Sequence, residues 1–407
     1  MSIELSFADG KLSIDIPDGV EVDEFAPIRV DKLLTFEQFR TEFQDSGGGK
    51  FLGEKPPLVV VNDAYRNTPT VTILGWLERI DRQLLDEAPC IIATGAHDAP
   101  TETQLQKVFG PFLERIRERL TIHDANNYDA MVKLGIDDKG GDVWLNKVAA
   151  EYQRLLLISS VEPHYFAGFT GGRKSLFPGL SDLATTERNH NLANSMLAAP
   201  LKLKGNPVVE HLDGLMQFMD PSHLFGLQAV LDATGEIAAL FCGQLEDAFS
   251  RATSRAEEIF AHEIDEQYDI VICELLPPLD KNLYQVQKAL ENCHEAVRNG
   301  GAIILVSACE EGVGSEHFVK LAESWDRSRN EPSDGRWLFG SHKLSRVNAH
   351  SQRIEVYLHS TLPETTARRV FYEPLDFVKK FLYLRSDQRE LHRLAVVHDA
   401  GNMVLKT

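Results

Sequence analysis

The sequence predicts an α/β fold with two domains, each built on a mainly parallel sheet that helices flank. Short continuous apolar runs alternate with longer amphipathic segments, which is the pattern of buried parallel strands joined by helices. The chain has 407 residues, too many for a single hydrophobic core. Because the pattern restarts near residue 265, we expect domains over residues 1–265 and 266–407, with the last residues free to return to the first domain.

Composition and charge narrow the class of protein. A chain with 43% hydrophobic and 25% charged residues is typical of a globular protein. The net charge of -19 argues against nucleic acid or an anionic membrane as a partner. The sequence has no run of about 18 apolar residues and no N-terminal leader pattern, so we expect a cytoplasmic protein without a membrane anchor. Five cysteines without Cys-x-x-Cys spacing predict buried free thiols.

The elements of the expected first domain change character along the chain. Residues 1 to about 55 alternate apolar and polar positions, which predicts a peripheral β ribbon. Three continuous apolar runs beyond them are predicted to be buried parallel strands with helices between them. Thr101 and Gln104 are spaced as a capping box for the helix after the second run. The runs cover residues 58–61, 90–93 and 155–158.

Side chains able to carry out chemistry follow each of these runs. Asp63 and Arg66 come after the first run, His97 after the second and His164 after the third. The carboxyl ends of parallel strands meet at one edge of a sheet, and ligands of open α/β folds bind there. We therefore expect these four side chains at a single rim, where a histidine can act as a general acid or base.

Residues 161–180, after the third run, form a glycine-rich segment with two cations. Glycines at 168, 171, 172 and 179 accompany Arg173 and Lys174. Glycine allows a ligand to approach the main chain closely, and the two cations suit a phosphate or a carboxylate. The alternative is a solvated turn between two elements. His190 follows on or beside a helix, and its spacing from the other histidines gives no zinc motif.

The expected second domain repeats the alternation of strand and helix. A strand over 268–274 precedes a helix over 283–298, which the glycines at 300 and 301 are predicted to end. Further strands are expected over 302–306, 353–358 and 394–397.

Three polar residues lie at the start of the predicted helix in the second domain. Tyr284 and Lys288 share one face, and Gln285 borders it. The positive end of the helix dipole makes this turn a suitable place for an anionic ligand. A solvated helix start is the alternative interpretation.

The residues alone leave other classes of protein open. The glycine-rich segment resembles the phosphate-binding loop of nucleotide hydrolases, except that Arg173 replaces the glycine required before the lysine. Lys174 could instead form a Schiff base with pyridoxal phosphate. The strands of the second domain resemble a methyltransferase sheet, so a nucleotide- or S-adenosylmethionine-binding transferase is the main alternative. A non-enzymatic binding domain would need only the cationic pocket.

Several motifs resemble the nickel-dependent lactate racemase family of 2-hydroxyacid racemases and epimerases, in the same order and over most of the chain. The segment from Pro163 to Lys174 is the most specific of them. Tyr65 stands where the family has a small residue, and Asp98-Ala99 replaces the commoner Arg-Pro, which leaves the identity of the hydroxyacid open. The other matching motifs are Asp63-Ala64-Tyr65-Arg66, Gly95-Ala96-His97, His190, and the segment from Pro278 to Lys288.

The resemblance implies an isomerase that inverts C2 of a 2-hydroxycarboxylate by reversible hydride transfer through a 2-ketoacid. Its cofactor would be the nickel-pincer nucleotide, Ni(II)-pyridinium-3,5-bisthiocarboxylic acid mononucleotide, attached covalently through Lys174. His190 would be the remaining ligand of a donor set that suits Ni(II). The residues implied to hold the nucleotide are Asp63, Ala64, Tyr65, Arg66, Gly171 and Gly172. Those implied to bind the substrate are Arg66, Tyr284, Gln285 and Lys288.

His97 and His164 are the acid–base pair that this chemistry implies. The hydroxyl proton must leave as the hydride does, and two histidines allow one to serve each enantiomer. The implied partners are a small 2-hydroxycarboxylate and the enzymes that build the cofactor, and a homo-oligomer is compatible with the sequence. The active site is expected in the cleft between the two domains.

Overall fold

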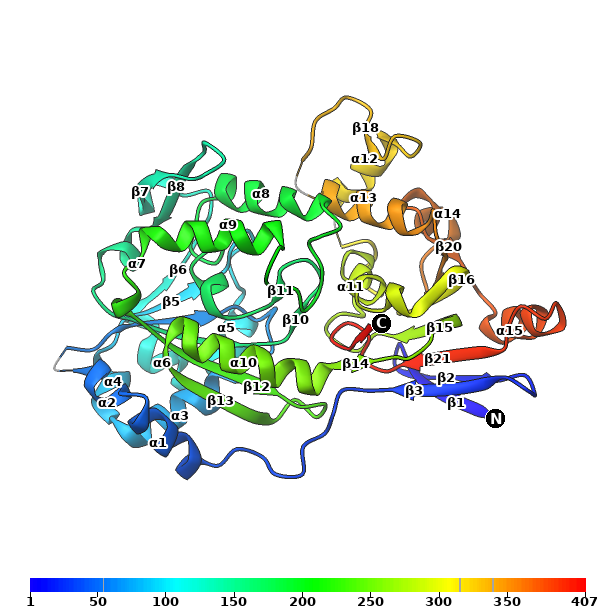
Figure 1. Cartoon of the computed structure of the whole chain (residues 1–407). Helices are drawn as coiled ribbons and strands as arrows, with labels where there is room; N and C mark the ends of the chain where they lie inside the picture. The colour runs from blue at the N-terminus through cyan, green and yellow to red at the C-terminus, as the bar shows by residue number, and fades with distance from the viewer. Residues whose placement is uncertain (54, 315, 339) are drawn as a thin grey trace.

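Two six-stranded sheets organise the molecule, shown by a computed structural model that describes residues 1–53, 55–314, 316–338 and 340–407 (Figure 1). We call each sheet, with the helices that cover it, a lobe. The α/β class predicted from the sequence is confirmed, because parallel pairs dominate both sheets. Within the described ranges, none of the helices combines the length and apolar character needed to cross a bilayer.

The sheet of the first lobe contains the three predicted strands as neighbours. Strands β4, β5 and β9 are parallel and lie side by side, and only β13 runs antiparallel to its neighbour. Side chains of β4 alternate between two hydrophobic clusters, Val59 and Val61 on one face and Leu58 and Val60 on the other. Burial of both faces explains the continuous apolar runs. In spatial order the strands are β13 (Ile237–Gln244), β12 (Leu224–Leu231), β9 (Leu155–Ser160), β4 (Leu58–Asn62), β5 (Cys90–Ala93) and β6 (Leu120–Ile122).

Helices cover both faces of this sheet. The predicted capping box is confirmed at the start of α5, where Thr101 and Gln104 each cap the other's backbone N–H. The helices are α1 (Phe36–Asp45), α2 (Gly48–Leu52), α3 (Thr70–Ile80), α4 (Arg82–Glu87), α5 (Glu102–Phe109), α6 (Leu113–Ile116), α7 (Lys147–Glu151), α8 (Leu183–Asn191), α9 (Pro207–Leu215) and α10 (Leu245–Phe260).

The second lobe has a fully parallel sheet, again buried on both faces. In spatial order its strands are β20 (Glu373–Pro374), β19 (Glu355–His359), β16 (Val297–Val306), β15 (Tyr268–Glu274), β21 (Arg393–Val397) and β3 (Glu21–Phe25). Its helices are α11 (Leu283–Cys293), α12 (Glu316–Glu323), α13 (Ser341–His350), α14 (Glu364–Arg369) and α15 (Val378–Asp387).

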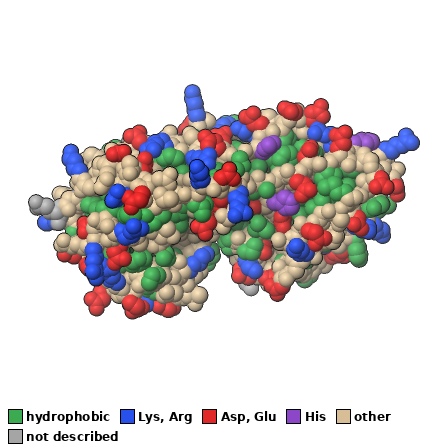
Figure 2. Space-filling view, turned by 90° about the horizontal axis from the view of Figure 1, so that it is seen from below, with side chains coloured by type: hydrophobic (Ala, Val, Ile, Leu, Met, Phe, Trp, Pro, Cys, Tyr) green, Lys and Arg blue, Asp and Glu red, His purple; other side chains and the backbone are tan. Residues whose placement is uncertain are grey.

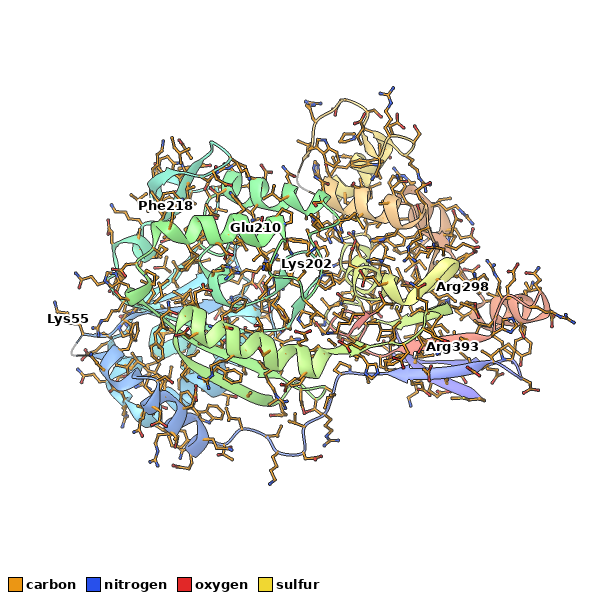
Figure 3. All side chains as sticks on the ribbon, in the orientation of Figure 1. Lys55, Lys202, Glu210, Phe218, Arg298 and Arg393 are labelled. Atoms are coloured by element: carbon orange, nitrogen blue, oxygen red, sulfur yellow. The ribbon has the colours of Figure 1, made fainter. Side chains whose placement is uncertain are left out.

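The N-terminal segment differs from the ribbon we expected. Only β1 (Ser2–Phe7) and β2 (Gly10–Asp15) form a hairpin, whereas residues 36–45 and 48–52 are helical. Strand β3 pairs with β21 and lies with the second lobe, although the expected division assigned residues 1–265 to the first domain. Arg393 on β21 lies 3.7 Å from Glu21 and 3.6 Å from Asp23, so charge favours this edge pairing (Figure 3). The sequence pattern did not predict the pairing of β3 with β21, because the two strands lie near opposite ends of the chain.

A second difference concerns the helix predicted over 283–298. Helix α11 ends at Cys293, and β16 begins at Val297. The glycines at 300 and 301, which we took as a helix stop, lie inside β16, where the pairing with β15 shifts register. Gly300 has a φ of 73°, which is the backbone conformation that a bulge of this kind demands.

The charged surface and the buried cysteines agree with what the amino-acid composition predicts. Acidic and basic side chains are interspersed on the face drawn in Figure 2, and the outline narrows at a notch between the lobes. All five cysteines, which lie in the described ranges, are buried and free, as predicted.

Candidate active site

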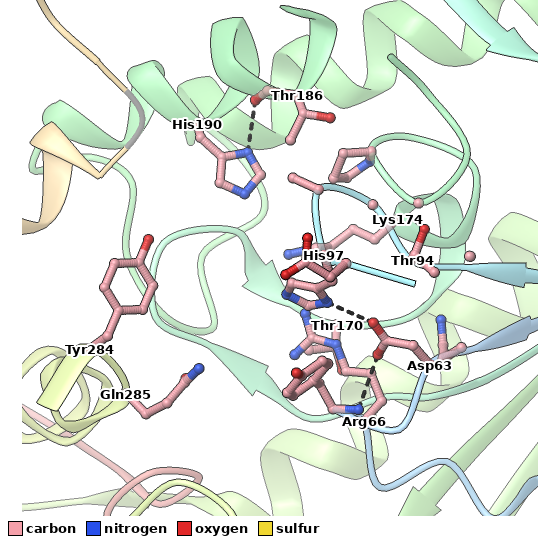
Figure 4. Close-up of a pocket in the computed structure, with 18 of the residues that line it drawn as sticks. Asp63, Arg66, Thr94, His97, Thr170, Lys174, Thr186, His190, Tyr284 and Gln285 are labelled. Atoms are coloured by element: carbon pink, nitrogen blue, oxygen red, sulfur yellow. Dashed lines mark hydrogen bonds and ion pairs between the residues drawn. The ribbon is translucent and has the colours of Figure 1, made fainter. Parts of the chain in front are cut away.

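A cavity of about 620 Å³ lies where the carboxyl ends of β4, β5 and β9 face the first turn of α11. Residues of both lobes line it, and Figure 4 shows Tyr284 and Gln285 on the opposite side from Lys174 and His97. The predicted residues that line it are Asp63, Tyr65, Arg66, His97, His164, Gly171, Lys174, His190, Tyr284 and Gln285.

His97 is held by a carboxylate at the rim of the first sheet. Its Nδ1 lies 2.6 Å from Oδ2 of Asp63, whose other oxygen accepts the backbone N–H of Tyr65 at 3.1 Å. Because a carboxylate can only accept, Nδ1 carries the proton, and in the neutral ring the lone pair lies on Nε2. The ring of Tyr65 lies 4.7 Å from that of His97. The imidazole is 49% exposed and the Asp63 carboxylate 7%, so a buried acceptor orients an accessible base.

In His164 the roles of the two ring nitrogens are reversed relative to those in His97. His164 lies in a short hairpin of β10 (Pro163–His164) and β11 (Gly168–Phe169), and its Nδ1 accepts the backbone N–H of Ala167 at 3.3 Å. In the neutral ring the proton is therefore on Nε2. Burial, together with the nearby cations Lys174 and Arg66, holds the pKa of His164 well below its usual value. The two histidines thus differ in tautomer, one offering a lone pair and the other an N–H.

Lys174 sits in a single 3₁₀ turn, Gly172–Ser175, at the bottom of the same cavity. Burial, then the charges of Arg66 and Lys288, hold the pKa of its amine well below the usual value. Its Nζ lies 5.5 Å from the centroid of the Phe166 ring. A lowered pKa increases the fraction of the amine in its nucleophilic, neutral form, so this lysine is suited to covalent attachment of an acyl or thioacyl group.

Arg173 does not line the cavity as we expected, and the glycines of the same segment have a role in chain packing. Arg173 points away from the cavity and is buried, with Nε 2.9 Å from Asp213 and its terminal nitrogen 2.9 Å from Glu246. A Cβ at any of the four glycines would meet protein atoms within 3.0 Å. Chain packing therefore requires glycine at these positions. Because Arg173 pairs with two carboxylates, Lys174 is the one cation of this fully described segment that faces the cavity. This weakens the resemblance to a phosphate-binding loop.

Two further predicted contacts lie off this cavity. Ala64 does not line it, and its carbonyl accepts from Lys107 Nζ at 3.0 Å. Gly172 does not line it either, and its N–H donates to Oε1 of Gln228 at 2.7 Å.

His190 lies on α8, as the sequence suggested, and faces the cavity. Its Nδ1–H donates to the carbonyl oxygen of Thr186, one turn earlier, at 2.9 Å (Figure 4). In the neutral ring the lone pair therefore lies on Nε2. Burial, then the charge of Lys174, lowers the pKa of His190 to about 3, which keeps the ring neutral. A neutral imidazole oriented by a backbone carbonyl is the usual arrangement of a histidine that binds a metal.

The second lobe contributes the first turn of α11. Tyr284 packs edge-on against Phe318 with ring centroids 5.5 Å apart, and Gln285 lies beside it on the cavity wall. Lys288, one turn later, does not line the cavity, but it lies close enough to lower the pKa of Lys174 and His164. Burial, then the charge of Arg66, lowers the pKa of Lys288 to about 7. Cations from both lobes thus converge in a protein whose net charge is -19, and this favours an anionic ligand.

Sequence reasoning missed several residues of this site. Asn282 lines the cavity before α11, and its buried Oδ1 has no hydrogen-bond partner among the described residues. Its position directly before the helix was a usable signal. Glu311 reaches the cavity from a loop of the second lobe and His317 from the start of α12, and no motif marks them.

Comparisons with known proteins agree with this geometry. Residues 51–199 match the model of the lactate racemase N-terminal domain, and residues 265–331 match that of the lactate racemase C-terminal domain. The chain is 28% identical to the lactate racemase of Thermoanaerobacterium thermosaccharolyticum over 346 residues, covering 82% of this chain and 79% of that protein. It is 30% identical to the lactate racemase of Lactiplantibacillus plantarum over 276 residues, covering 65% of this chain and 63% of that protein.

The fold agrees as well. A solved structure of the lactate racemase apoprotein from Thermoanaerobacterium thermosaccharolyticum superposes with a TM-score of 0.86, at 23% identity and with 100% of both chains covered. Two matching domains in the expected order, two relatives and one shared architecture point the same way. The chain belongs to the lactate racemase family of isomerases.

Proposed function

We propose that this protein is a racemase or epimerase that inverts C2 of a 2-hydroxycarboxylate. One observation carries the proposal: two histidines in opposite tautomers share a cavity with Lys174, His190 and Arg66, and Lys288 adds a further amine close behind its wall. Lactate, malate, a longer hydroxyacid or a sugar acid would present the same carboxylate and hydroxyl to this site.

We further propose that the cofactor is the nickel-pincer nucleotide. The described residues fit it, because Lys174 offers an amine of lowered pKa for attachment and His190 offers a neutral imidazole as a metal ligand. Asp63, Tyr65, Arg66 and Gly171 would hold the nucleotide part. When bound, the cofactor would supply the acceptor that takes a hydride from C2 and returns it.

The chain's own residues would bind the substrate and move the proton. Arg66, Gln285 and Lys288 would hold the carboxylate and orient the hydroxyl, with Tyr284 beside them. His97 Nε2 would accept the hydroxyl proton of one enantiomer, while the Nε2–H of His164 donates a hydrogen bond to the same oxygen. Return of a proton from the His164 side needs a His164 ring that has taken a second proton from solvent before the turnover, and the lowered pKa of this ring favours donation of that proton. Each turnover would leave the two histidines with exchanged protons.

Isotope labelling tests this scheme. Protein co-produced with the enzymes that build the cofactor, with bound nickel verified by metal analysis, is incubated with a panel of enantiopure 2-hydroxyacids. We expect one of them to become a mixture of both configurations. A substrate deuterated at C2 should keep its label in both products. Loss of that label to water would contradict hydride transfer, and absence of turnover across the panel would contradict the proposed reaction.

A further inference from the structure

Helix α13 is buried although its side chains are polar. His342, Lys343, Arg346 and His350 are each at most 3% exposed. Charged side chains are seldom buried this completely unless they are paired. In Figure 1 the helix lies between α8 of the first lobe and the rest of the second lobe, and it contacts both α8 and α11. Helix α8 carries His190, and α11 carries Tyr284 and Gln285. Helix α13 therefore packs against helices that line opposite sides of the cavity.

Arg346 shows how α13 connects the lobes. Its guanidinium pairs with the buried carboxylate of Glu291 on α11. It also donates to the carbonyl oxygens of Ala193 at 3.2 Å and Ser195 at 3.1 Å, just beyond α8. Since this cation has a carboxylate partner, we assign it to the stability of the lobe contact.

Lys343 makes a different set of contacts. Its Nζ donates to the backbone carbonyl of Tyr284 at 2.9 Å and lies 4.1 Å from the centroid of the Tyr284 ring. The same atom lies 4.6 Å from the centroid of the Tyr165 ring. No carboxylate of the described residues lies within 4.0 Å of it. Burial and nearby cations lower the pKa of Lys343, and N–H groups facing the rings and the carbonyl remain in either protonation state.

The two tyrosines lie on segments that line opposite sides of the cavity, Tyr165 next to the lining residue His164 and Tyr284 on the facing wall. Tyr165 follows His164 directly, and their rings stack at 5.0 Å. Tyr284 opens the turn of α11 that also presents Gln285. One amino group therefore contacts both the hairpin that carries His164 and the turn that faces the substrate.

We propose that Lys343 is a positioning residue for the reaction: its amino group, held between Tyr165 and Tyr284, sets the distance between the His164 hairpin and the first turn of α11. This inference rests on the proposed function, because the distance matters only if both walls contact one substrate. Lys343 does not line the cavity, so it would act through the two tyrosines. A shift of about 1 Å between reacting groups costs about 10²-fold in rate.

The test compares Lys343→Met, which keeps the length and burial of the side chain, with Lys343→Arg, which restores donors at its end. Lys380→Met, at an exposed position of α15, is the matched control. For Lys343→Met we expect kcat to fall about 10- to 100-fold, with KM changed far less and with nickel content and Tm retained. Lys343→Arg should recover part of kcat, and Lys380→Met should match the wild type. Unchanged kcat in Lys343→Met, or a loss accompanied by falling nickel content and Tm, would overturn the proposal.

A second measurement separates this inference from the reaction itself. Hydrogen–deuterium exchange of the protein should become faster at residues 283–288 in Lys343→Met, while the strands of both sheets keep their protection. This readout needs no turnover, so it still tests Lys343 if no hydroxyacid proves to be a substrate. Exchange at 283–288 equal to that of the wild type would refute the positioning role.

Discussion

The two lobes contain the same pair of side chains in two different settings. At the rim of the first sheet, Nδ1 of His97 lies 2.6 Å from Asp63. At the rim of the second sheet, Nδ1 of His398 lies 2.6 Å from Glu274. Both pairs lie at the carboxyl ends of parallel strands. By distance and chemistry alone, either pair would qualify as an oriented general base.

The second nitrogen of each ring distinguishes the pairs. Nε2 of His398 lies 3.2 Å from Glu24 on β3, so both nitrogens face carboxylates. Hydrogen bonds to Glu274 and Glu24 raise the pKa of His398, and the ring links β21 to the N-terminal edge of the sheet. Nε2 of His97 has no partner among the described residues, and His97 lines the cavity. A histidine–carboxylate pair is therefore structural or functional according to what its other nitrogen faces.

The largest effect is expected from removing the accessible ring. His97→Ala should lower turnover by about 10²–10⁴, the usual contribution of a positioned acid or base. Bound nickel and Tm should stay at their wild-type values, because the ring is half exposed. Chiral chromatography of the hydroxyacid, metal analysis and thermal melts measure the three quantities. Turnover near the wild-type rate would contradict the role of His97.

A smaller loss is expected when only the orientation of that ring is disturbed. Asp63→Asn can donate to Nδ1 and so favours the wrong tautomer, which should reduce kcat by about 10–10³-fold. Glu274→Gln makes the corresponding change in the other pair and should leave kcat unaltered while lowering Tm. The comparison of the two pairs fails if both variants lose activity equally.

The smallest effect is expected for His398→Ala, which should destabilise the fold by about 1 kcal/mol without changing turnover. The raised pKa of His398 stabilises the folded state fully below its unfolded pKa of about 6.5, and this contribution is lost as pH rises through the folded pKa. Burial opposes ionisation of Glu274, but hydrogen bonds from His398 and Ser6 leave its pKa lowered, so its contribution needs a pH above about 5. Urea unfolding should therefore show the largest difference from wild type between about pH 5 and 6.5. A difference that grows toward pH 9 would contradict this assignment.

Much of the candidate site could be predicted because strand ends constrain it. Asp63, His97 and His164 each follow a short apolar run, and three parallel strands bring their carboxyl ends to one rim. The position of His190 on a helix and of Tyr284 and Gln285 at a helix start followed from local patterns in the same way. Each of these inferences depends on spacing along a single segment, which the order of residues contains.

Other features were decided only by the tertiary structure. Arg173 and Lys174 are adjacent in one motif, yet Arg173 pairs with Glu246, 73 residues away, whereas Lys174 lines the cavity. Strand β3 joins the far lobe through β21, and Lys343 lies between two tyrosines from different lobes. A motif limits which residue types occur and how far apart they are in the chain. The direction of each side chain depends on charges and rings from remote segments, and these meet only when the lobes pack.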